Sequence, residues 1–459
     1  MAADATARPQ GQTTWLGEAG ANLALALPIA VAFLAQMATI FVDNVMVGRL
    51  GADELAAGGL GANLQFTPLL LGMGVLAGVA AIASHAFGAS DRNMAAVVAR
   101  QGLRLSMALS IPCGLLLLVM ILVLPYLGYD PRTVRLAQGL LLWSLPGVPA
   151  FLAYSALRYF ATAANRPRIV TVVAILSIGV TALSNYLFVY GRLGMPRLGV
   201  PGVGVSGSIS AWLQLLAVAA YLRLDRKFHA FRVFSHLTKP DPAFWEILRL
   251  GWPIAGSYMF ENGLFVATTL LIAVLGNAAL AANAVVGGLC SFTFMIPYAV
   301  GQAATVRVGR ALGASQPAAA RRAGYTALHL GVIWMLLAAT LFLSVPRLLI
   351  GLYVDLSMPG NQPMLAVALT LLPIAALFQV FDGTQAVAGG ALRGLKDTRL
   401  PMVICFIGYW LVGISAASLL GFWAGYGAVG FWIGLALGLA VTAILLSLRF
   451  HRLARRLAP

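Results

Sequence analysis

The chain has 459 residues, of which 60% are hydrophobic and only 10% are charged, and its mean hydropathy is +0.89. This composition excludes a soluble domain and is typical of a protein that crosses a membrane many times. A membrane span requires about 20 predominantly apolar residues. Windows of that length predict twelve spans, at residues 23–48, 55–87, 103–124, 134–162, 168–190, 203–222, 249–275, 279–309, 322–345, 364–392, 401–422 and 428–448.

These spans must be helices, because lipid offers no partner to an open backbone group and the apolar runs are too long for the short strands of a barrel. We therefore expect an all-α membrane protein. The first twenty residues are polar and lack the basic, apolar and small-residue regions of a cleaved signal peptide, so we expect none. The cysteines lie far apart within apolar spans, which argues against disulfides or a metal site; they are Cys113, Cys290 and Cys405.

The net charge of +16 raises the question of nucleic-acid binding, and the location of the basic residues answers it. Given the predicted spans, 24 of the 30 Lys and Arg residues fall on the side that holds both termini. The other six are Arg49, Arg132, Arg135, Arg192, Arg197 and Arg347. By the positive-inside rule, this asymmetry places both termini in the cytoplasm and accounts for the basicity without nucleic acid.

An internal repeat divides the chain. Residues 28–90 and 253–315 align without a gap at an offset of 225, with 14 identities in 63 positions. The identities cluster at helix starts and turns, as in "PIA" at Pro28 and Pro253, and "NRPRIV" at Asn165 resembles "KDTRLP" at Lys396 further along. An offset of six spans keeps both halves in one orientation, so we expect two six-helix lobes related by a pseudo-twofold axis along the membrane normal.

The predicted organisation follows from this repeat. It comprises a cytoplasmic segment at residues 1–22, an N-lobe at 23–222, a cytoplasmic linker at 223–248, a C-lobe at 249–448 and a basic cytoplasmic tail at 449–459. The linker is the longest basic, proline-containing connection in the chain, as is typical of a connection between domains.

Three acidic residues lie within predicted spans, whereas the other eleven lie in termini, loops or span ends; the three are Asp43, Glu261 and Asp382. A charge at helix-centre depth costs about 2.5–3.5 kcal/mol on insertion scales. The nearest basic residues, such as Arg393, lie at span ends. A buried carboxylate without a fixed counter-ion either holds a proton or captures a mobile cation. The alternative is a permanently protonated carboxyl that is hydrogen-bonded between helices.

The two halves do not carry the same acids. At the offset of 225, Glu261 aligns with Gln36 and Asp43 aligns with Thr268. Glu261 and Asp382 belong to the second half at similar depths, so they could face each other across the C-lobe, whereas Asp43 serves the N-lobe alone. Flexible and aromatic side chains could line a tolerant apolar cavity, although ordinary packing also explains them; the candidates are Met46, Met73, Met259, Phe265, Phe292, Met295 and Tyr298.

Three segments together resemble a known family. "QMATIFVDNVMVGRLGADELAA" from Gln36, "NYLFVYGRLG" from Asn185 and "LRGLKDTRLPM" from Leu392 are similar to the multidrug and toxic compound extrusion transporters, in particular their NorM-like branch. The resemblance covers all twelve spans. It implies two lobes around a central cleft that opens alternately to either side, with export of organic cations in exchange for Na⁺ or H⁺.

The same resemblance implies roles for individual residues. Asp43 matches the family's first-helix acid and Asn185 the nearby fifth-helix amide, so they form a candidate N-lobe polar site with Thr181 and Gln36. Glu261 and Asp382 match the C-lobe acids associated with cation binding, and they are the candidate Na⁺ ligands. Phe378 and Thr181 occupy places where the family can carry a tyrosine and a second amide. The sequence therefore leaves the choice between Na⁺ and H⁺ open.

The leading hypothesis is a monomeric inner-membrane antiporter for amphipathic organic cations, without catalytic residues and without a cofactor beyond the coupling ion. In this hypothesis, Glu261 and Asp382 bind the driving cation, and Asp43 with Asn185 forms a proton or substrate site. A flippase for lipid-linked precursors is the alternative, but it should carry Arg or Lys at mid-depth to hold a phosphate. An intramembrane transferase would need clustered acids for metal-diphosphate binding, whereas these three acids lie on separate spans.

Overall fold

The computed structural model describes residues 14–225, 228, 231, 233–234 and 241–457. Those residues are helical and contain no strand, which confirms the predicted all-α fold. Residues 1–13 of the predicted N-terminal segment and residues 226–227, 229–230, 232 and 235–240 of the predicted linker lie outside the described residues.

Long helices make up both halves. The elements of the first half are α1 (Trp15–Gly48), α2 (Ala52–Gly88), α3 (Arg92–Val123), η1 (Leu124–Leu127), α4 (Pro131–Ser144), η2 (Leu145–Gly147), α5 (Val148–Ala163), α6 (Pro167–Phe188) and α7 (Pro201–Leu224). Those of the second half are α9 (Pro242–Ala273), α10 (Asn277–Gly313), α11 (Pro317–Ser344), α12 (Pro346–Gly351), η3 (Pro359–Asn361), α13 (Gln362–Gly394), α14 (Arg399–Phe406), η4 (Ile407–Ile414), α15 (Ser415–Ser418), η5 (Leu419–Trp423) and α16 (Gly427–Arg456).

Eleven helical segments of the described chain are long and apolar enough to cross a membrane. They correspond to eleven of the twelve predicted spans, and the remaining one is α9, which has 32 residues. Glu261 and Asn262 lie in the middle of α9 and lower its mean hydropathy. α9 is therefore the long helix that is less apolar than the other spans, and it carries the candidate site residue Glu261.

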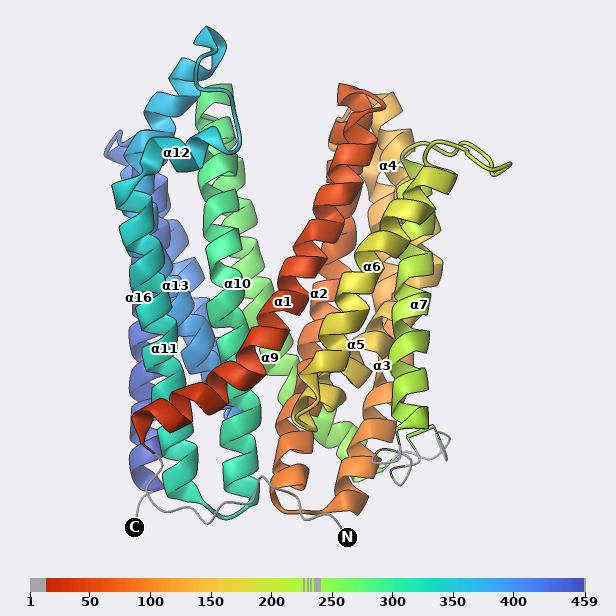
Figure 1. Cartoon of the computed structure of the whole chain (residues 1–459). Coiled ribbons are helices and arrows are strands. Elements are labelled where there is room, and N and C mark those ends of the chain that lie inside the picture. Colours follow the sequence, from red (N-terminus) through yellow and green to blue (C-terminus); the bar gives the residue numbers. More distant parts are fainter. Residues whose placement is uncertain (1–13, 226–227, 229–230, 232, 235–240, 458–459) are drawn as a thin grey trace.

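Two helical bundles lie side by side and diverge toward one end (Figure 1). We call the end at which α1 begins and α16 finishes the terminal end, and the opposite one the distal end. One bundle contains α2 to α7 and the other contains α10 to α16, in agreement with the two predicted six-helix lobes.

The first helix of each repeat crosses from one bundle to the other. Leu25, Ile29 and Phe33 of α1 belong to the hydrophobic core of the C-lobe, whereas the rest of α1 packs on α6 of the N-lobe. In the same manner, Ile247 and Ile254 of α9 belong to the core of the N-lobe. α1 changes direction along its length (Figure 1). Each of these helices contains a proline that removes an internal hydrogen bond, at matched positions of the repeat.

The turns at the terminal end repeat as well. Ser90 and Ser315, which are 225 residues apart, have left-handed φ angles of 57° and 55°. Asn165 and Lys396, the first residues of the two later matching motifs, have φ angles of 62° and 59°. Non-glycine residues rarely adopt this conformation, so its recurrence at matched positions supports the predicted duplication.

The lobes meet at the terminal end through close backbone contacts. A Cβ atom on Gly88 of α2 would lie 2.0 Å from the carbonyl oxygen of Arg310 on α10. A Cβ atom on Gly313 of α10 would lie 2.1 Å from the carbonyl oxygen of His85. Small residues allow helix backbones to approach this closely, so the closed end depends on glycine.

Polar contacts reinforce the closed terminal end. The His85 ring nitrogen Nε2 donates to the Gly394 carbonyl at 2.8 Å, and Arg310 Nε donates to the Ala163 carbonyl at 3.0 Å. Glu18 of α1 forms an ion pair with Arg307 of α10. Each of these contacts joins a residue of the first half to a residue of the second.

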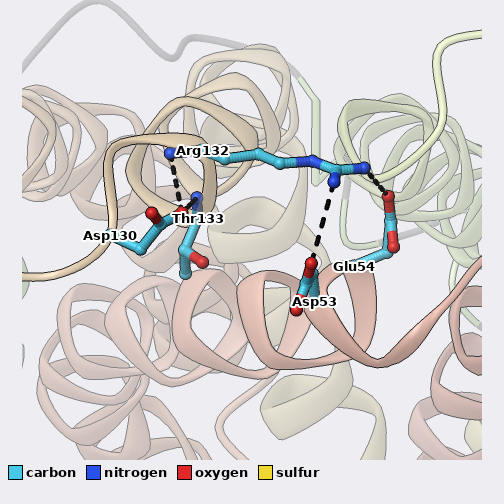
Figure 2. Close-up of polar contacts among 5 residues, drawn as sticks. All are labelled: Asp53, Glu54, Asp130, Arg132 and Thr133. Carbon is cyan, nitrogen blue, oxygen red and sulfur yellow. Dashed lines mark hydrogen bonds and ion pairs between the residues drawn. The ribbon is translucent and has the colours of Figure 1, made fainter.

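A charged cluster joins α2 and α4 at the distal end of the N-lobe (Figure 2). Arg132 donates to Glu54 at 2.7 Å and lies 3.7 Å from Asp53. The Asp130 carboxylate accepts from the backbone N–H groups of Arg132 and Thr133, and thus caps the first turn of α4.

We expect Arg132→Ala to change stability little, because the Arg132 side chain is 59% exposed and exposed ion pairs contribute about 0–1 kcal/mol. Asp130→Ala should be more harmful, since loss of a helix N-cap costs about 1 kcal/mol. Apparent melting temperatures of the purified variants in detergent would test this order. A larger loss for Arg132→Ala than for Asp130→Ala would show that the ion pairs matter more than the cap.

Candidate functional site

A single amide joins the two acids of the C-lobe. Gln385 Nε2 of α13 donates to Glu261 Oε1 of α9 at 3.0 Å and to Asp382 Oδ1 at 3.3 Å. Asp382 is 4% exposed, and Glu261 is half-buried. The structure therefore brings Glu261 and Asp382 to one place within the C-lobe.

The helix geometry explains this arrangement. Asp382 and Gln385 are three residues apart on α13, so their side chains lie on one face of that helix. Gln385 was not among the residues predicted from the sequence. The available signal was an uncharged polar side chain one turn after an intramembrane acid, in a segment that is otherwise apolar.

Among the described residues, no Lys or Arg lies at ion-pair distance from the three intramembrane acids. The five ion pairs of the described residues involve other carboxylates. Arg393, at the end of α13, nevertheless lines the same cavity as Glu261, and this cavity has a volume of about 40 Å³. Its guanidinium lies over the ring of Tyr258, 5.7 Å from the ring centroid.

Further oxygen atoms of the C-lobe are buried near this region. Tyr409 of η4 is fully buried, and its hydroxyl has no hydrogen-bond partner among the described residues. η4 packs against α9. Phe378, where the family can carry a tyrosine, packs its ring against Trp432 and Phe265. The ring of Phe378 thus has a packing role, and the sequence analysis did not single out Tyr409.

A second polar pair lies in the N-lobe. Asn185 Nδ2 of α6 donates to Asp43 Oδ1 of α1 at 2.6 Å. Asn185 is fully buried, and its Oδ1 atom has no partner among the residues that the structure describes. An amide oxygen and a carboxylate therefore converge where a cation or a proton donor could be accepted.

The other two members of the predicted N-lobe site lie apart from this pair. Thr181 is one turn before Asn185 on α6, but its hydroxyl donates to Ser210 of α7 at 3.3 Å. Gln36 is half-buried and lies seven residues before Asp43 on α1, which is about 10 Å along the helix axis.

The seven apolar cavity candidates do not form one group of contacts. Tyr298 of α10 lies at the centre of an aromatic cluster, with its ring 4.9 Å from that of Phe33 and its hydroxyl 3.4 Å from that of Tyr258. Phe265 contacts Phe378 within the C-lobe. Phe292 is 58% exposed and Met73 is 7% exposed. Met46, Met259 and Met295 are half-buried.

One buried arginine borders this aromatic cluster and was not singled out from the sequence. Arg158 of α5 is 8% exposed. Its guanidinium lies 5.5 Å from the ring centroid of Phe33 and 5.1 Å from that of Tyr159. Contacts of this kind can stabilise a desolvated cation. Arg158 is therefore a buried basic residue beside α1. It lies in the last two turns of α5 and not at the middle of the membrane span.

Two repeated helical bundles, crossing helices and separate buried acids in each lobe define the class of this chain. It is a multi-pass membrane protein with the architecture of a transporter built from repeats.

The chain belongs to the MATE transporter family. The MatE family model matches residues 28–187 and 253–419, so the two matches begin 225 residues apart, at the offset of the internal repeat. The chain is 41% identical to a probable multidrug resistance protein NorM of Mesorhizobium japonicum, over 100% of this chain and 98% of the relative. It is 40% identical to a protein of the same description from Pseudomonas aeruginosa, over 97% and 91% of the two chains.

Solved structures agree on the fold. A eukaryotic MATE transporter superposes with a TM-score of 0.85 at 22% identity, over 96% of this chain and 98% of that one. An outward-facing multidrug resistance MATE family transporter superposes with a TM-score of 0.86 at 18% identity, over 98% and 100% of the chains.

Proposed function

We propose that this protein is an antiporter that exports amphipathic organic cations in exchange for Na⁺ or H⁺. Two relatives that are about 40% identical over nearly their whole length carry the description multidrug resistance protein. The exchange itself is argued from the acids, because a carboxylate in a low-dielectric interior is neutralised by a proton, a bound cation or a basic partner.

The bridge between Glu261, Gln385 and Asp382 carries the proposal. Two carboxylates share one neutral amide and have no Lys or Arg at ion-pair distance in the described chain. Carboxylate and amide oxygens are suitable ligands for a hard cation such as Na⁺, and either carboxylate can also take a proton. Because a bound drug and a coupling ion both alter the charge of the site, binding of one can weaken binding of the other.

The N-lobe pair of Asp43 and Asn185 serves in this proposal as a proton or substrate site. The amide oxygen of Asn185, which has no hydrogen-bond partner among the described residues, supports this role. A buried acceptor without a partner costs about 1–3 kcal/mol unless a ligand or a water molecule donates a hydrogen bond to it. The basic asymmetry of the loops supports a cytoplasmic location for the terminal end, in a protein that we propose lies in a bacterial inner membrane. The lobes are then closed toward the cytoplasm and diverge toward the outside.

Reconstituted vesicles loaded with a fluorescent organic cation would test the proposed function. We expect an imposed Na⁺ gradient or an imposed pH gradient, applied separately, to drive movement of the dye, and the effective gradient identifies the coupling ion. If neither gradient moves dye through protein that is folded and inserted, the antiport proposal is wrong.

Gln385→Leu should alter ion binding without removing either charge. The variant deletes both hydrogen bonds that the amide donates to the carboxylates. Hydrogen bonds to charged groups contribute about 1.5–3 kcal/mol and stabilise the empty, ionised site, so we expect the apparent affinity for a coupling proton to rise roughly tenfold or more. Dye efflux at graded ion concentrations would measure this shift.

Gln379→Leu is the matched control for Gln385→Leu. Gln379 is fully buried on the same helix. Its amide oxygen accepts a hydrogen bond from the Thr293 hydroxyl at 2.8 Å, and this bond does not involve Glu261 or Asp382. Equal changes of ion affinity in the two variants would contradict a specific role for Gln385.

A further inference from the structure

The cavity next to Glu261 extends away from the acid cluster toward the terminal end of the C-lobe. Its lining includes Glu261 of α9 and Gln385 of α13 at one end, and Asp397 and Thr398 of the α13–α14 turn at the other. Gln385 and Arg393 both line it and are eight residues apart on α13, which corresponds to about 12 Å. The cavity therefore follows α9 and α13 beside the boundary between the lobes, because Ile254 and Tyr258 of its lining also belong to the core of the N-lobe.

The walls of this cavity are suited to water and ions. Its volume of about 40 Å³ accommodates roughly two or three water molecules. Polar side chains are present along its whole length; they are Ser257, Tyr258, Glu261, Tyr298, Gln385, Arg393, Asp397 and Thr398. At the terminal end, Asp397 is paired with Arg449 at 2.8 Å, so a charge pair marks that end of the cavity.

Arg393 lies along this cavity, between Glu261 and Asp397. A guanidinium remains charged at any physiological pH, and it raises the energy of a second cation nearby. Arg393 rests over the ring of Tyr258 and makes no ion pair within the part of the chain that the structure describes. It is therefore a tethered positive charge without a fixed acidic partner, on the route between a deep carboxylate and the terminal end.

From this geometry we infer that the cavity is the cytoplasmic exit of the coupling cation and that Arg393 is its gate. The inference rests on the proposed antiport function. While Arg393 lies over Tyr258, its charge slows entry of cations from the cytoplasm. Glu261 is one helical turn beyond Tyr258 on α9, so the guanidinium can replace a departing cation at the carboxylate. Charge stays balanced during the exchange, because one positive charge takes the place of another.

A native cysteine reports on this route. Cys405 lines the cavity, whereas the two other cysteines of the chain, Cys113 and Cys290, are buried elsewhere. Silver ion is a small monovalent cation that reacts with thiols. The wild-type protein in chloride-free vesicles would be exposed to silver nitrate from one face at a time, and the thiols left unreacted would be alkylated and quantified for each cysteine by mass spectrometry.

We expect silver to reach Cys405 from the cytoplasmic face roughly tenfold faster than it reaches Cys113 or Cys290. Arg393→Gln should raise the Cys405 rate from that face by roughly another tenfold, because it removes the repelling charge, and it should produce a cation leak without drug. Arg393→Lys should retain the wild-type rate. Arg399→Gln is the matched control, since Arg399 is exposed at the start of α14 and does not line the cavity.

Reaction of Cys405 from the external face alone, or equal rates in Arg393→Gln and Arg399→Gln, would overturn the inference. The readout needs no drug transport. Normal antiport with external access alone would refute the exit route and leave the proposed function intact. Access from the cytoplasmic face in a protein that moves no dye would refute antiport and leave the route intact.

Discussion

Glu261→Gln and Asp382→Asn should each abolish ion-driven export while leaving the amount of protein in the membrane unchanged. Both substitutions keep the shape of the side chain and remove its charge, so the site can no longer hold a cation or exchange a proton. A coupling free energy between two ligands is typically about 1–3 kcal/mol, or about 5- to 150-fold in affinity, and it vanishes when one ligand loses its site. Membrane insertion should not suffer, because an intramembrane charge opposes insertion.

Dye efflux from vesicles and drug resistance of cells that express each variant would measure these effects. Glu246→Gln is the matched control, since Glu246 belongs to the same helix as Glu261 but pairs with Lys396 at 2.8 Å and is 38% exposed. We expect Glu246→Gln to export nearly as well as the wild type. Undiminished export by Glu261→Gln and Asp382→Asn would refute the assignment of the coupling site.

Gly313→Val should prevent the lobes from closing at the terminal end. The new Cβ atom would lie 2.1 Å from the carbonyl oxygen of His85 on α2, whereas ordinary contacts begin near 3.4 Å. Overpacking of this kind typically costs about 1–3 kcal/mol, which corresponds to a shift of roughly 5- to 150-fold between two states. Separation of the lobes relieves the overlap without unfolding either one. The variant should therefore favour the state that is open at the terminal end and lose transport.

Distances between spin labels on the two lobes at the terminal end, measured by electron paramagnetic resonance, would show this shift. Gly59→Val on α2 is the control, because a Cβ atom at Gly59 meets nothing within 4 Å. Unchanged label distances in Gly313→Val would mean that the close backbone approach does not determine which end is closed.

Much of the fold could be predicted from the sequence, because hydrophobicity along the chain is a local property. The predicted span at 279–309 corresponds to α10, Asn277–Gly313, and the matching motifs at Ser90 and Ser315 predicted turns that have the same backbone conformation. The crossing of α1 and α9 could not be predicted. Which bundle a helix face packs against depends on residues far away in sequence, and neither helix has a strongly one-sided apolar pattern that would point to its partner.

The candidate site was predicted in part. The intramembrane acids stand out because burial of a charge is costly, and the structure places Asp43 against Asn185 and joins Glu261 to Asp382 through Gln385. Neutral participants carry no such signal: Gln385 and Tyr409 resemble ordinary polar residues until their contacts are known. Arg393 lies at a helix end, as predicted, but only the structure shows that its side chain shares a cavity with Glu261.

Part of the first helix of each half packs in the core of the other half, so the folding of one half depends on the other. The N-terminal half leaves the ribosome first, yet its hydrophobic core includes Ile247, Ile254 and Ala255, which are made only after the six preceding spans. The C-terminal half in turn needs Leu25 and Phe33. Neither half can finish packing alone. If the chain were cut between residues 225 and 241, the first helix of each fragment would still pack in the core of the other fragment.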